Sequence, residues 1–201
     1  MEPVFKRRTA LRGAAVLAAG AAAPVGVAAA DEFAELAWRA SAPGISPQPF
    51  RTRIVSGVPA VAGYGTSVTL GPVIVQAISH QSFPLILRGA GYTSLTATVT
   101  AAVVVTDARG LSGRLPMTIV FPRVTVPTTA VETVLTGTAT LTGTPQLPAV
   151  RNPGTMTIKV ESPAKGAVTV FNNAGVGTSI TSTITLFPVN GDPLAATIEV
   201  R

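Results

Sequence analysis

His80 is the residue that could take part in the widest range of chemistry, because it is the only histidine among the 201 residues. A serine hydrolase needs an imidazole as general base beside a hydroxyl nucleophile, and His80 lies between Ser79 and Ser82. The Gly-x-Ser-x-Gly turn that presents the nucleophile in many hydrolases does not occur in the sequence. We therefore expect an exposed loop histidine and assign no catalytic residue. A secreted hydrolase with a minimal site around His80 stays as an alternative.

Carboxylates and metal ligands are equally sparse. The carboxylates after residue 50 are Asp107, Glu132, Glu161, Asp192 and Glu199. Their places in turns or on polar strand faces favour solvated surface charges over the paired acid and base of a glycosidase. The chain has no cysteine, and zinc usually needs several histidine or cysteine ligands. We therefore expect neither a metal site nor a cofactor.

The first thirty residues have the pattern of an export signal. A basic start that contains Arg7 and Arg8, with Leu11 just after it, precedes an uncharged, alanine-rich run over residues 13–27. A basic segment followed by a short apolar segment is typical of a secretory signal. The adjacent arginines and the modest hydrophobicity resemble a twin-arginine signal. An ordinary secretory signal that happens to carry two neighbouring arginines remains the alternative.

The apolar run ends at a small-residue cleavage site. Ala28 and Ala30 supply the small side chains, so we expect the mature chain to begin at Asp31. A stable helical span needs about 20 strongly apolar residues, and neither this run nor any later one reaches that length. The sequence therefore predicts no stable transmembrane segment once the signal is removed. The expected location is secreted or in the cell envelope, reached through the twin-arginine route.

Removal of the signal halves the net charge. The whole chain carries 15 basic and 9 acidic residues, a net charge of +6, and the first thirty residues contribute half of it. The remaining basic residues are scattered, whereas nucleic-acid-binding proteins gather Lys and Arg into a stripe, often with stacking aromatic residues. This distribution argues against a nucleic-acid partner. We therefore expect an unknown cell-wall or protein partner. The sequence does not predict the oligomeric state.

From about residue 50 onward, apolar residues alternate with threonine. In one long run Leu95, Val99 and Val103 fall on one face, while Thr96 and Thr98 fall on the other. Similar alternation recurs over residues 115–121, 135–141, 156–160, 180–186 and 194–200. This period is typical of strands with one face on a core and one in water. Turn residues separate the runs, so we predict an all-β sandwich or barrel.

Two segments depart from this pattern. Ser82 precedes an early proline and the run ends at Gly89, which predicts a single helical turn over residues 82–89. Residues 31–39 have apolar residues at helical spacing, and prolines make residues 41–49 an extended linker. We therefore expect a stub and linker over residues 31–49 and one ordered domain over residues 50–201.

Some of the segments that punctuate the strands resemble a known family. They are Leu87-Arg88-Gly89-Ala90-Gly91, Leu115-Pro116-Met117-Thr118-Ile119 and Pro153-Gly154-Thr155-Met156-Thr157-Ile158. Together they resemble an uncharacterised family of exported actinobacterial immunoglobulin-like domains, over about residues 50–200. The resemblance implies a single antiparallel immunoglobulin-like sandwich of about eight strands. It implies no catalytic residue, and the cysteine pair usual in the family is missing here.

Aromatic residues indicate where such a domain could bind a partner. Tyr64 is flanked by glycines and Tyr92 follows one, so both could line a carbohydrate or protein contact or simply plug an end of the sandwich. We predict an exported extracellular or cell-envelope module for binding, adhesion or structure. An outer-membrane β-barrel is a further alternative, because strands of about 10 to 12 residues would fit it. The threonine faces and the few aromatic residues weigh against it.

Overall fold

The structure is a computed structural model that describes residues 35–42, 45–65, 68–70, 72–142, 146–147, 153–178, 183–188 and 194–201. The residues of the expected signal and its cleavage site lie outside these ranges, namely Arg7, Arg8, Leu11, Ala28, Ala30 and Asp31. The described residues form fourteen strands and one short helix, so the prediction of an all-β fold is confirmed.

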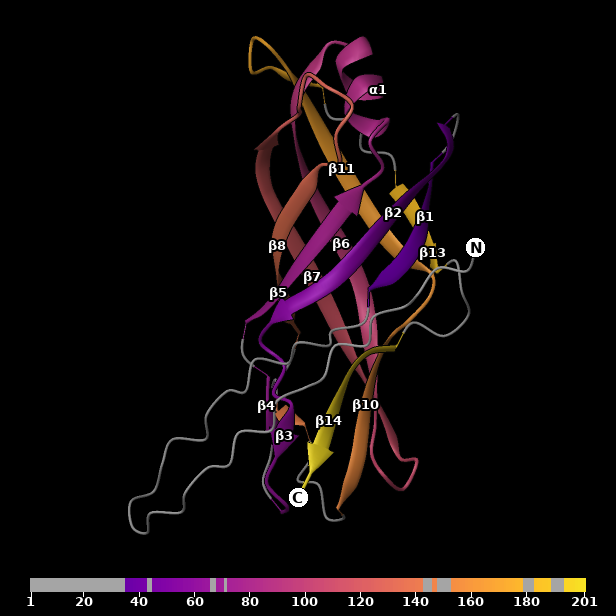
Figure 1. The fold of residues 1–201 in the computed structure, drawn as a ribbon, viewed down its shortest axis with the longest axis vertical. Coiled ribbons are helices and arrows are strands. Elements are labelled where there is room, and N and C mark those ends of the chain that lie inside the picture. The colour runs from indigo at the N-terminus through magenta and orange to yellow at the C-terminus, as the bar shows by residue number, and fades with distance from the viewer. Residues whose placement is uncertain are drawn as a thin grey trace, which may run out of the picture.

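Strands make up most of the described chain, and Figure 1 shows them along one long axis, with α1 at one end and β3 at the other. In chain order the elements are β1 (Leu36–Ala42), β2 (Ile45–Ser56), β3 (Val61–Ala62), β4 (Val68–Thr69), β5 (Val73–Ser79), α1 (Phe83–Gly89), β6 (Tyr92–Thr106), β7 (Ser112–Thr125), β8 (Val134–Leu141), β9 (Gln146–Leu147), β10 (Gly154–Val160), β11 (Ala164–Asn172), β12 (Gly177–Thr178), β13 (Thr183–Pro188) and β14 (Leu194–Val200).

β6 illustrates why the alternating runs form strands. Leu95, Val103 and Val105 are buried, whereas Thr98 and Thr100 are exposed. Successive side chains of a strand point to opposite faces, so one face loses its contact with water while the threonines stay solvated. The predicted assignment of the two faces is confirmed for this strand.

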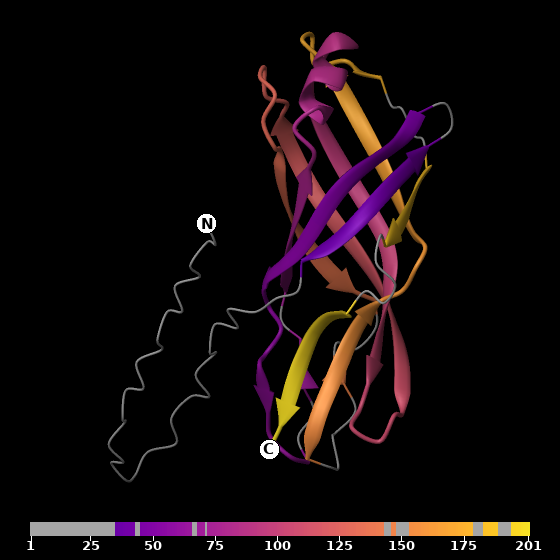
Figure 2. The same ribbon diagram turned by 45° about the vertical axis from the view of Figure 1, so that its right-hand side comes forward.

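Eight of the strands close into a ring. Its neighbours, in order, are β6, β7, β8, β5, β2, β1, β13 and β11, and the pairing of β11 with β6 joins the two ends. All eight pairings are antiparallel. Figures 1 and 2 show β1 and β2 on the wall opposite β6 and β7. A closed sheet satisfies both edges of each strand and encloses the side chains that face inward.

The expected immunoglobulin-like sandwich is not confirmed. Apart from the two-stranded β4–β9 ladder, the described strands belong to one continuous sheet in place of two facing sheets. Alternation within a strand indicates that one face is buried, but two packed sheets and one closed sheet bury that face equally well. The choice of partner strands decides between the two arrangements.

A smaller layer extends the sheet beyond the ring. Residues 103–106 of β6 pair with β10, which pairs with β14, and β14 pairs in parallel with β3. Ile198 of β14 is fully buried and belongs to the same core as the ring residues. Figure 2 shows β10 and β14 side by side at the end of the molecule that carries the C-terminus. The ring and this layer therefore share one hydrophobic core.

The one helix of the described residues lies at the opposite end. α1 covers residues 83–89, in agreement with the predicted helical turn, and its Pro84 is buried. The chain leaves the helix through Gly91, which has a φ of +83° and donates its N–H to the Arg88 carbonyl at 2.9 Å. The Arg88 guanidinium in turn donates to the carbonyl of Val126, which ties α1 to the segment after β7. No described helix has the length and apolar character needed to cross a membrane.

The ordered sheet begins earlier than the predicted boundary at residue 50. β1 occupies part of the expected stub, and Leu36–Arg39 are strand where helical turns were expected. Trp38 is buried and stacks on Phe50 of β2, so tertiary packing overrides the local helical spacing. Pro49 lies opposite Arg39 of β1 but outside the pairing of β2 with β5, which begins at Phe50, so its missing N–H removes no hydrogen bond from the β2–β5 ladder.

Candidate functional site

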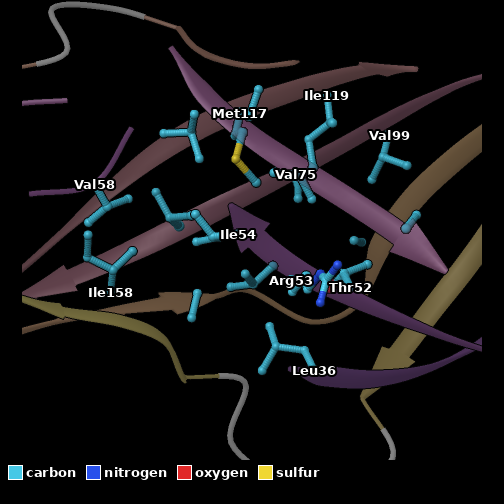
Figure 3. A pocket seen from close by; sticks show the side chains of 18 of the residues that line it. Leu36, Thr52, Arg53, Ile54, Val58, Val75, Val99, Met117, Ile119 and Ile158 are labelled. Carbon is cyan, nitrogen blue, oxygen red and sulfur yellow. The ribbon is translucent and has the colours of Figure 1, made fainter. Parts of the chain in front are cut away.

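The ring and the smaller layer together border a cavity of about 90 Å³. Its wall is formed by residues of β1, β2, β5, β6, β7, β8, β10, β11 and β14, together with Val58 and Leu70 near the smaller layer. Figure 3 shows Val75 and Met117 on one side of this space and Leu36 on the other. Nearly all of these lining residues are hydrocarbon in character, so the cavity is apolar.

Five alanines keep this space open. Ala77, Ala101, Ala139, Ala164 and Ala195 all line the cavity, and they come from β5, β6, β8, β11 and β14. A methyl group places the wall further back than valine or leucine would, and protein interiors otherwise pack without voids of this kind. The cavity therefore arises from small side chains distributed around the wall and not from one missing side chain.

Trp38 provides the largest aromatic surface of the wall. Its side chain is 4% exposed, and its ring stacks on Phe50 with the centroids 6.5 Å apart and the planes inclined by 17°. Both rings line the cavity, and aromatic faces offer large apolar contact areas. Because Trp38 is the only tryptophan of the chain, its fluorescence and its indole N–H signal report on this cavity alone.

A hydrogen bond joins two residues of the wall. The Nε1–H of Trp38 donates to Oγ1 of Thr52 at 2.8 Å. The two residues meet because β1 and β2 form an antiparallel pair in which Leu36 lies opposite Thr52 and Trp38 lies two residues further along. Both Trp38 and Thr52 line the cavity. Thr52 is thus the residue of the described wall that carries a hydroxyl group.

Arg53 is the charged residue among the described residues of the wall. Its side chain is exposed, and its Nε donates to Oε1 of Gln76 at 2.8 Å, across the pairing of β2 with β5. This hydrogen bond holds the guanidinium on the outer, hydrated face. A buried charge without a partner is strongly unfavourable, so the cavity suits uncharged molecules.

The two tyrosines expected to bind a partner lie far apart. Tyr64 follows β3, is 58% exposed, and its backbone N–H donates to the carbonyl of Arg201 at 2.7 Å. Tyr92 begins β6 beside α1, and its half-buried ring packs against the core. Figure 1 places these two segments at opposite ends of the molecule. The structure thus does not bring Tyr64 and Tyr92 into one site.

His80 makes a local contact at the start of α1. Its Nδ1 lies 2.8 Å from the hydroxyl of Ser82 and accepts the backbone N–H of Ser82 at 3.3 Å. The two residues are separated by one residue in the sequence, and His80 is exposed. Within the described ranges no carboxylate contacts the His80 ring. The arrangement therefore matches a side chain that caps a turn, a role that histidine shares with other polar residues.

The described carboxylates after residue 50 pair with arginines. Asp107, Glu132, Glu161 and Glu199 form ion pairs with Arg109, Arg51, Arg114 and Arg201, in that order. The hydrogen bond from Arg114 lowers the pKa of the Glu161 carboxyl below its usual value. Asp192 lies outside the described residues. Among the residues that are described, no three His, Asp or Glu side chains gather as a metal site would require.

Sequence reasoning did not single out the cavity or its polar pair. Trp38 falls in the segment assigned to a stub, and Thr52 precedes the long alternating runs. The usable signal was weak: Ala101 and Ala139 occupy inward positions in strands whose other inward residues are mostly larger. Small residues at inward positions of several strands indicate space only when the strands are known to close on one another.

Comparison of the chain with family models, with curated proteins and with solved structures gives no match.

Proposed function

We propose that this chain is an exported extracellular or cell-envelope binding protein that holds one small, uncharged, apolar molecule inside its closed sheet. The observation that carries the proposal is the apolar cavity bordered by alanines from five strands. A closed sheet of eight strands is wide enough either to be filled by its own side chains or to hold one small ligand. The alanines of the wall favour the second use.

The energetics of the cavity support a ligand. Residual cavities destabilise proteins by about 24 cal/mol per Å³, so the 90 Å³ found here corresponds to about 2 kcal/mol. A molecule that fills the space restores the missing dispersion contacts. Apolar cavities of about 150 Å³ bind benzene or xenon, so the expected ligand for the smaller cavity found here has about six non-hydrogen atoms or fewer.

Binding is proposed ahead of catalysis because of where the reactive groups lie. The described carboxylates pair with arginines at the surface, and His80 contacts Ser82 on the outside. The described residues of the cavity wall include neither a carboxylate nor an imidazole. An apolar space whose described wall carries no general acid or base fits retention of a molecule better than its conversion.

Export and kinship rest on the sequence. Residues 1–30 support a removable signal, by the twin-arginine route, that leaves Asp31 as the first residue. Membership in the family of exported immunoglobulin-like domains is supported only by the sequence motifs between the strands. The connectivity of the sheet does not support it. Mass spectrometry of the protein in culture medium should find Asp31 at the N-terminus. A secreted chain that still begins at Met1 would count against this signal.

The binding proposal is tested with methylenecyclopentane, an uncharged hydrocarbon of suitable size, and the full chain. We expect a saturable rise in Tm and a saturable change in the fluorescence of Trp38, which lines the cavity. Ala101→Ile, which fills the cavity, should abolish both effects. Thr98→Ile, on the exposed face of the same strand, should leave them intact. Absence of both effects in the unmodified chain, or equal effects in Ala101→Ile, would rule out binding in this cavity.

A further inference from the structure

We infer that the cavity selects a ligand with one hydrogen-bond acceptor oxygen on an otherwise hydrocarbon body, such as a small ketone or ester, and that the Thr52 hydroxyl donates to that oxygen. This inference rests on the proposed function, because it specifies the chemical class of ligand for the same cavity. It follows from the polar pair in the wall and from the outward position of Arg53, the charged residue of the described wall.

The hydrogen bond within the pair leaves one donor unused. The indole N–H can only donate, whereas a hydroxyl carries one hydrogen and two lone pairs. Since Trp38 donates to Thr52 at 2.8 Å, it occupies a lone pair and leaves the hydroxyl hydrogen free. Among the described residues, the Thr52 hydroxyl takes part in this hydrogen bond, as its acceptor, and in no other. Thr52 therefore keeps a donor available beside the cavity.

The indole also fixes the direction of this donor. Trp38 is 4% exposed and stacked on Phe50, so its N–H has a fixed position. A hydroxyl that accepts a hydrogen bond from one side directs its own hydrogen away from that side. Thr52 lines the cavity and is half-buried, and Figure 3 shows it among the side chains around the space. The pair is thus a prearranged donor for one acceptor.

The other described residues of the wall disfavour charged ligands and ligands with several polar groups. The charge of Arg53 is held outside through Gln76, so a carboxylate or phosphate would enter without a partner. A ligand with several polar groups would leave most of them without hydrogen bonds against hydrocarbon side chains, which is strongly unfavourable. The single hydroxyl donor of Thr52 can satisfy one acceptor oxygen on the ligand.

The test compares two probes of nearly equal shape, cyclopentanone and methylenecyclopentane, with the full chain. Calorimetry measures each affinity, and each is corrected for the partitioning of the probe between water and a hydrocarbon solvent. We expect a corrected preference for the ketone of at least about fivefold, the effect of one hydrogen bond. Thr52→Val, which replaces the hydroxyl by a methyl group, should remove this preference, while Thr52→Ser should keep it. The Trp38 indole N–H resonance should shift with the ketone and less with the hydrocarbon.

The outcomes separate this inference from the proposed function. If both probes bind with equal corrected affinity, or if Thr52→Val retains the ketone preference, the acceptor selection is wrong and the binding proposal stands. If neither probe binds the unmodified chain, the proposed function fails and the inference fails with it. Should Thr52→Val fail to fold, the preference in the unmodified chain and the Trp38 resonance still decide the matter.

Discussion

A side chain at position 137 would collide with Phe121: a Cβ built on Gly137 lies 2.7 Å from the Cδ1 of the Phe121 ring. Gly137 belongs to β8 and Phe121 to the neighbouring strand β7. Phe121 is 3% exposed and lines the cavity. The missing side chain of Gly137 thus makes room for an aromatic ring inside the closed sheet.

We expect Gly137→Ala to destabilise the protein by about 1–3 kcal/mol, the usual effect of overpacking. The reason is that Phe121 must leave its position or the two strands must separate. Gly113→Ala in β7 is the control, because a Cβ there would meet no atom within 4 Å. Urea unfolding of both variants measures the difference. Equal stability of the two would mean that Phe121 can move without cost.

The two faces of β6 predict opposite responses to a charge. Val103→Asp should unfold the protein, since Val103 is 6% exposed and an unpaired buried carboxylate costs several kcal/mol, which is comparable with the whole stability of a domain. Thr98→Asp should be tolerated, because Thr98 lies on the exposed face. Circular dichroism and urea unfolding compare the variants, and similar damage at both positions would overturn the face assignment.

Neighbouring alanines of β6 predict opposite responses to added volume. Ala101 lines the cavity, so Ala101→Ile should keep or raise Tm by filling empty space, while the binding of methylenecyclopentane is lost. Ala102 is 2% exposed and is not among the lining residues. Ala102→Ile should therefore lower stability by about 1–3 kcal/mol. Differential scanning calorimetry with and without the probe measures both effects, and a large loss of stability in Ala101→Ile would argue against usable space.

The ion pair between Arg114 and Glu161 predicts that the stability of the protein decreases slightly at acid pH. The hydrogen bond from Arg114 lowers the pKa of Glu161, and Glu161 correspondingly raises the pKa of Arg114. A carboxyl whose pKa is lowered by folding stabilises the protein above its ordinary pKa, and this contribution is lost as the pH falls through the lowered value. Glu161→Gln should therefore lose less stability than the unmodified chain between about pH 5 and pH 3. Thermal unfolding across this range, repeated in 1 M salt to screen the pair, tests the expectation.

Local patterns in the sequence were sufficient for some elements. Alternation of valine with threonine identified β6, and Ser82 with Pro84 identified α1. Local patterns do not predict the closure of the sheet, because it depends on pairings between distant strands, such as Gly166 of β11 with Val99 of β6. The sequence around either residue does not indicate which strand it pairs with. β1 was missed since its burial comes from the contact of Trp38 with a later strand.

The candidate site was less predictable than the fold. Trp38 and Thr52 form a pair only once β1 and β2 are aligned in register. The space beside them exists only when five strands each place an alanine on the same interior. The amphipathic rings of Tyr64 and Tyr92 predict contact with a partner, but residue type does not predict where in the fold each ring lies. Which residues of the site lie close together depends on how the whole chain folds, and their spacing along the sequence predicts little of this.

β6 belongs to two structures at once, since residues 92–100 pair with β11 in the ring and residues 103–106 pair with β10 in the smaller layer. Unfolding of either the ring or the smaller layer therefore disrupts β6, on which the other one depends. The molecule should therefore lose its structure in one cooperative step. A change at the C-terminal end, where β14 pairs with β10, can reach the strands around the cavity through the shared strand β6.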